Sequence, residues 1–109
     1  MPDSTTDIRA ALAKLALDDV EVLFAISHLQ PAASPALLAW IEHAADWELQ
    51  RRKGFDFRLA PVDEAIDASE NAVATAAAIA LHDEFAGNSA LARFFASTVD
   101  VLVIRGELL

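Results

Sequence analysis

The sequence predicts an all-α protein, a single-domain bundle of four to five amphipathic helices. Most segments repeat apolar residues every three or four positions, which is the period of an α-helix. Residues that favour helix starts (Ser, Asp, Asn and Pro) and helix ends (Gly) separate these segments at short intervals. The 109 residues contain no low-complexity spacer, so one domain is expected.

The predicted central helix spans residues 35–53. Ser34 suits its N-cap, and Pro35 suits the first helical position, where the missing N–H has no cost. The basic residues 51–53 complement the helix dipole, and Gly54 can adopt the left-handed conformation that ends helices. Its apolar surface is broad, which predicts neighbouring helices on more than one side. This surface comprises Leu37, Leu38, Trp40, Ile41, Ala44, Ala45, Trp47 and Leu49.

Two helices are predicted before it, at residues 5–15 and 18–30. Asp18 followed by Glu21 is similar to a capping box and favours a new helix start. The alternative is one long helix over 5–30, because the apolar spacing stays close to a heptad, but Asp19 would then lie in the apolar seam. We favour two helices and expect the second to be enclosed by neighbours.

Two more helices are predicted after it, at residues 61–86 and 89–105. We expect Asn88 or Ser89 to cap the last helix and Gly106 to end it. The predicted inward residues of the first of these helices are Val62, Ala65, Ile66, Ser69, Val73, Ala76, Ala77 and Ala80. Those of the second are Leu91, Phe94, Phe95, Thr98, Val99 and Leu102.

The connection at residues 55–59 alternates apolar and charged residues, a period of two. We interpret it as an extended connector held to the bundle by its apolar side chains. The alternative is a short strand whose pairing partner would come from another subunit, since no other strand is predicted.

Composition limits the classes of partner. The formal net charge is −9, from 17 acidic and 8 basic residues, which disfavours binding to nucleic acid or to anionic membranes. There is no cysteine, so disulfides and thiolate chemistry are excluded. The N-terminal stretch is polar and acidic, unlike a signal peptide, and prolines interrupt the longest charge-free run. We therefore expect a cytoplasmic protein.

One residue breaks the apolar pattern of the central helix. Glu48 falls near the middle of its apolar surface, and a carboxylate in a core must be paired or neutralised. Pairing with Arg51 or Arg52 is the simpler interpretation. The alternative is a buried acid in a pocket lined by Trp40 and Trp47.

Other polar groupings are typical of solvated helix faces. The carboxylates Asp63, Asp67 and Glu70 share one predicted face, and His43 lies one turn from Asp46, but both sets flank the apolar stripes. We expect no metal and no cofactor. Nucleophile and phosphate-loop motifs are missing, so we assign no catalytic residue.

The function we favour is a protein–protein interaction or accessory module without enzymatic activity, forming a homodimer or binding another protein. The alternative is a small-ligand-binding or catalytic bundle that uses the region of Trp40, Trp47 and Glu48. The candidate binding residues are Trp40, Trp47, Glu48, Phe55 and Phe57.

Overall fold

The computed structural model describes residues 4–55 and 66–108, and within these ranges it contains six helices and no strand. The all-α prediction is therefore confirmed, with one more helix than the upper number expected. The helices are α1 (Ser4–Ala13), α2 (Leu17–Phe24), α3 (Ile26–Leu29), α4 (Pro35–Arg52), α5 (Ala68–Glu84) and α6 (Ser89–Leu108).

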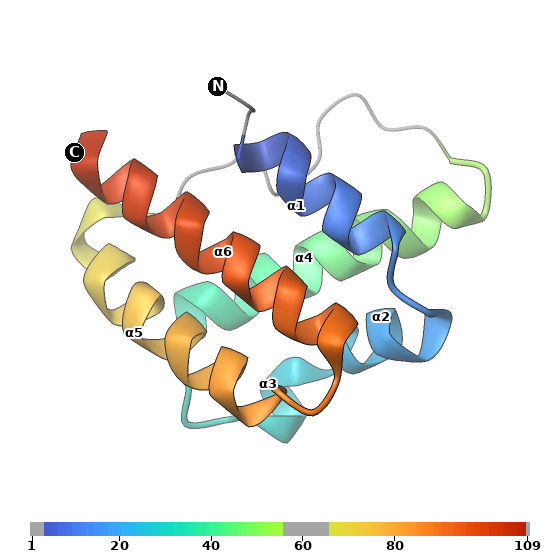
Figure 1. The fold of residues 1–109 in the computed structure, drawn as a ribbon, viewed down its shortest axis with the longest axis horizontal. Helices are drawn as coiled ribbons and strands as arrows, with labels where there is room; N and C mark the ends of the chain where they lie inside the picture. Colours follow the sequence, from blue (N-terminus) through green and yellow to red (C-terminus); the bar gives the residue numbers. More distant parts are fainter. Residues whose placement is uncertain (1–3, 56–65, 109) are drawn as a thin grey trace.

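The helices form two layers. In one layer α6 lies between α1 and α5, and in the other α4 packs with α2 and α3 (Figure 1). Helix α4 contacts α1, α2, α3 and α5, which confirms that the central helix has neighbours on several sides. The radius of gyration is 12.8 Å, close to the value of about 13 Å for a compact domain of this size. None of the described helices is long and apolar enough to cross a membrane.

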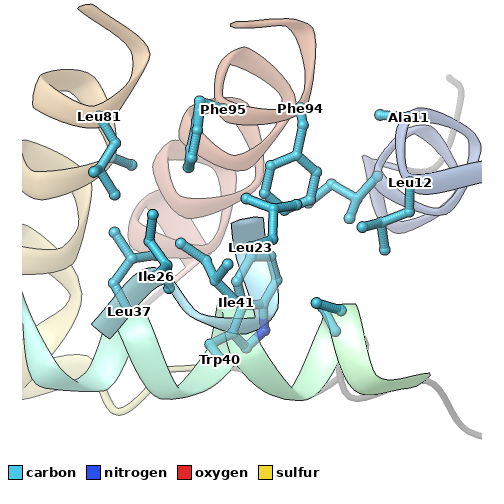
Figure 2. Packing of buried hydrophobic residues seen from close by; sticks show 14 of the residues in the cluster. Ala11, Leu12, Leu23, Ile26, Leu37, Trp40, Ile41, Leu81, Phe94 and Phe95 are labelled. Carbon is cyan, nitrogen blue, oxygen red and sulfur yellow. The ribbon is translucent and has the colours of Figure 1, made fainter. Parts of the chain in front are cut away.

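The core lies between the two layers. Phe94 and Phe95 of α6 are fully buried and meet edge to face, with ring centroids 5.4 Å apart. Figure 2 shows Leu37, Trp40 and Ile41 of α4 on the opposite side of this core, with side chains of α1, α2 and α5 around them. Aromatic rings contribute most per residue because each removes a large apolar area from water.

Local caps set several helix ends as expected. Ser34 Oγ accepts a hydrogen bond from the Leu37 backbone N–H, which confirms the predicted N-cap of α4. Asn88 Oδ1 accepts from the backbone N–H groups of Ala90 and Leu91 and caps α6. Gly54 follows α4 with a φ of 98°, the left-handed conformation that a glycine adopts without strain.

The predicted helix at 18–30 is interrupted. The structure places a turn at Ala25, so α2 and the single turn α3 replace one helix, and α1 ends separately at Ala13. The expectation that this region is enclosed was wrong. Leu17, Phe24 and Leu29 are each about half exposed, because among the described helices α2 and α3 pack chiefly against α4.

Two predicted boundaries of the last helices differ. Helix α5 begins at Ala68, and residues 66 and 67 before it are not helical, because Asp67 accepts a hydrogen bond from the Ser69 backbone N–H and acts as the N-cap. Residues 61–65 lie outside the described part. Helix α6 continues through Gly106, where a Cβ would lie 3.1 Å from Asn71 Oδ1. This glycine permits a close approach to α5 and does not end the helix.

The exposed face of α5 is the largest difference from expectation. Its buried residues are Asn71, Ala74, Ala78 and Leu81. Of the residues predicted to face inward, Ile66 just before the helix is buried and Ala77 is partly buried, while Val62 and Ala65 lie outside the described residues. Ser69, Val73, Ala76 and Ala80 are exposed, and Val73 itself is 56% exposed. Because the alanine-rich sequence is apolar on every side, its pattern does not select a face. Packing against α6 selects it.

We predict that Phe94→Ala destabilises the protein by about 3–5 kcal/mol, because it removes a fully buried ring from the core. Phe24→Ala is the matched control, since that ring is 49% exposed and should cost under about 1 kcal/mol. Denaturant melts measure both free energies of unfolding. Equal losses in the two variants would contradict the described core.

Candidate functional site

The buried carboxylate of Glu48 is held by two arginines. Its side chain is 0% exposed. Arg51 donates from Nε to Glu48 Oε1 at 2.7 Å and from Nη2 to Oε2 at 2.9 Å, while Arg52 Nε donates to Oε2 at 2.9 Å. Both carboxylate oxygens are therefore engaged in charge-assisted hydrogen bonds, the kind that offsets the cost of burying a charge.

Arg52 also connects α4 to α1. Its Nη2 donates to the backbone carbonyl oxygen of Leu12 at 3.0 Å and to that of Leu15 at 2.7 Å. Leu12 lies in the last turn of α1, where carbonyls lack intrahelical donors and carry partial negative charge, and Leu15 lies two residues beyond the helix. The guanidinium therefore satisfies one helix-end carbonyl and one carbonyl of the following turn. Glu48 thus orients an arginine that joins helices about 40 residues apart in the chain.

The pKa of Glu48 follows from this geometry. Burial acts to raise it, but the hydrogen bonds from Arg51 and Arg52 and their positive charges outweigh burial, and the pKa is lowered below its usual value. The carboxylate is therefore ionised at neutral pH. A general acid or base works best with a pKa near the operating pH, and the shift here is in the opposite direction.

Of the predicted binding residues, the four that the structure describes differ in accessibility, and only Phe55 is exposed. Trp40 is buried in the core, and Trp47 is partly buried beside it. The indole N–H of Trp47 is buried without a hydrogen-bond partner among the described residues. Phe55 is 57% exposed just beyond α4, and Phe57 lies outside the described residues.

Three other polar residues of α4 either bind a neighbouring helix or face water. Glu42 Oε1 accepts a hydrogen bond from the Ser27 backbone N–H at 2.9 Å. Hydrogen bonds from the side chain of Ser27 and from this backbone N–H lower the pKa of Glu42. His43 and Asp46 are exposed. Within the described ranges no three His, Asp or Glu side chains are grouped as metal ligands.

A groove opens between α5 and the turn that precedes α4, with a volume of about 480 Å³. Most of its lining consists of small apolar side chains, and Glu84 is its one charged residue. Ser34 is already occupied in capping α4. The lining residues are Gln30, Ala32, Ala33, Ser34, Val73, Ala76, Ala77, Ala80, Leu81 and Glu84.

A smaller cavity of about 230 Å³ lies between the end of α1 and the start of α6. Lys14 and Arg93 line it with Ser89 and two alanines, and both cations are exposed. The first free N–H groups of α6 are already capped by Asn88. The cavity therefore offers two surface charges and no buried polar group.

The groove was missed by sequence reasoning because the α5 residues that line it, Val73, Ala76, Ala77 and Ala80, were predicted to face the core. The available signal was the alanine run itself. Alanines bury little area each, so a helix made of them can leave one face uncovered at little cost in stability. Nothing in the pattern shows which face that is.

We predict that Glu48→Gln lowers the free energy of unfolding by about 2–3 kcal/mol at neutral pH. We expect a smaller loss than for breaking a fully buried ion pair, because the Arg51 and Arg52 side chains are 45% and 25% exposed. A carboxylate whose pKa is lowered by folding stabilises the protein above its unfolded pKa. That contribution disappears as the pH falls through the folded pKa. The difference between the variants should thus be constant at pH 6–8 and shrink below about pH 4.5.

Chemical denaturation at each pH measures this difference. Glu21→Gln is the matched control, because Glu21 is exposed on α2 and its change should stay within about 0.5 kcal/mol. A Glu48→Gln loss that is unchanged at pH 3 would show that packing, not charge, stabilises this region.

Comparisons with protein-family models, with curated proteins and with solved structures found no match for the chain.

Proposed function

We propose that this chain is a non-enzymatic interaction module of the cytoplasm, which binds a helical segment of a partner protein on α5. The observation that carries the proposal is the groove of about 480 Å³ beside an uncovered apolar helix face. Single exposed apolar residues are ordinary on protein surfaces, whereas an apolar face joined to a concave groove is typical of helix recognition.

The side chains along the groove suit a helix. Ala76, Ala77 and Ala80 are small, so the backbone of a second helix can approach closely. Val73 and Leu81 add larger apolar side chains to the same groove. An approaching helix with apolar residues at i, i+3, i+4 and i+7 would extend the layer of α1, α6 and α5 by one more member.

Small-ligand binding or catalysis has weaker support. A ligand site combines an enclosed apolar cavity with several convergent polar groups. In this groove Gln30 and Glu84 are the polar side chains not engaged in a cap. Neither cavity described above is lined by Trp40, Trp47 or Glu48, the residues on which the alternative function depends.

Self-association through residues 55–59 is a separate proposal. The exposed ring of Phe55 supports an apolar contact at this point, while the rest of the segment lies outside the described residues. We predict that Phe55→Asp converts a dimer into a monomer, because a charge would be buried in the contact. Light scattering during size exclusion at micromolar concentration measures the mass. A wild-type mass of one chain across the dilution range would contradict the dimer.

The groove proposal is tested with three synthetic helical peptides of about 18 residues, all with the same stripe of leucine and alanine. Their other positions carry mainly lysine, glutamate or glutamine. We predict that at least one binds with one-to-one stoichiometry and shifts the backbone amide resonances of the groove residues. Replacing Ala76 and Ala80 with Gln should weaken binding at least 10-fold by filling the groove with polar side chains.

Ala96→Gln is the control, because Ala96 is exposed on α6 and does not line the groove. Circular dichroism melts establish that all variants are folded. Absence of binding by every peptide at about 0.5 mM, or binding that Ala76→Gln with Ala80→Gln leaves unchanged, would overturn the proposed function.

A further inference from the structure

We infer that the helix bound by α5 is cationic, with lysine or arginine flanking both ends of its apolar stripe. The inference depends on the proposed function and adds to it the chemistry of the partner. Two exposed carboxylates, one at each end of the apolar face of α5, support it.

Glu70 and Glu84 flank this apolar face. They are 14 residues apart on α5, which is two heptads, so they lie on one side of the helix with Ala77 midway between them. At 1.5 Å per residue the two Cα atoms are about 21 Å apart. Val73, Ala77 and Ala80 occupy the interval, and Figure 1 shows α5 at the edge of its layer, with α6 on one side only.

Both carboxylates are available for a partner. They are exposed, and neither forms an ion pair or a side-chain hydrogen bond in the described part of the chain. Glu84 is the last residue of α5, where the helix dipole adds partial negative charge. Among the described residues, no lysine or arginine lines the groove, and Glu84 does. The potential over this end of the groove therefore favours a cation.

A second copy of the chain fits this face poorly. An antiparallel pairing of two α5 helices centred on Ala77 would place Glu70 opposite Glu84 of the other copy, and a parallel pairing would place each glutamate opposite itself. Like charges that face each other are unfavourable.

A cationic helix suits both the apolar face of α5 and the two carboxylates that flank it. Its apolar stripe would cover Val73, Ala76 and Ala80, and its terminal lysines or arginines would lie near Glu70 and Glu84. The negative charge of the whole chain would accelerate its association. Affinity would then fall as salt screens the charges, and the apolar contribution would remain at high salt.

The experiment compares the lysine, glutamine and glutamate peptides by isothermal titration at about 20 mM and about 500 mM salt. At low salt we expect the lysine peptide to bind at least 3-fold more tightly than the glutamine peptide, and this advantage should disappear at high salt. The double variant Glu70→Gln with Glu84→Gln should weaken lysine-peptide binding by about 3- to 10-fold at low salt, with no effect on the glutamine peptide.

The matched control is Glu21→Gln with Asp100→Asn. It changes the net charge by the same amount at two exposed positions outside the groove. An equal effect of the two double variants would overturn the inference, because it would reflect net charge alone.

Other outcomes separate this inference from the proposed function. Equal or tighter binding of the glutamine or glutamate peptide in the groove would overturn the cationic partner and leave the helix-binding function intact. Binding of no peptide would overturn both. A wild-type dimer whose resonances broaden along Val73, Ala77 and Ala80 would identify a second copy as the occupant and overturn the cationic partner as well.

Discussion

The buried carboxylate of Glu48 is the interaction on which the arrangement of the helices depends most directly. It holds two guanidinium groups, and one of them reaches the carbonyl oxygens at the end of α1. The first and fourth helices are thereby joined by a chain of charge-assisted hydrogen bonds at one end of the bundle. Helix α1 also packs against α6 and α4, and Arg52 adds polar contacts at the point where α1 ends.

Helix α4 joins its neighbours by polar contacts as well as by apolar ones. In the first half of α4, Glu42 accepts a hydrogen bond from the backbone of α3. Near the C-terminal end of α4, Glu48 accepts a hydrogen bond from Arg52, which contacts the chain at the end of α1. Both carboxylates have lowered pKa values, and both are used to position other helices. This use explains why the most unusual acidic residue of the sequence is not a candidate for catalysis. Its lone pairs are already occupied by Arg51 and Arg52.

The binding surface that we propose is a consequence of the layer arrangement. Helix α6 lies between α1 and α5, so α5 has a neighbour helix in its layer on one side only. The turn before α4 lies beside the uncovered side of α5 and forms the second wall of the groove. Since alanine contributes little apolar area, leaving this face in water has a small cost for folding. A partner helix would recover that area, and the exposed glutamates at its two ends would select the charge of that partner.

The sequence by itself determined the features that depend on neighbouring residues in the chain. The all-α class, the caps at Ser34 and Asn88, the left-handed Gly54 and most of the inward face of α6 follow from side chains within a few positions of one another. Glu48 could be singled out in the same way, together with its two arginines. Only the tertiary structure decided the contact of Arg52 with α1, the turn at Ala25 and the rotation of α5. The first depends on groups distant in the sequence, and just after the turn the Ser27 N–H donates to the distant Glu42. The rotation depends on packing because the alanine-rich helix is apolar all round, so only the fit against α6 and Asn71's approach to Gly106 distinguish its faces.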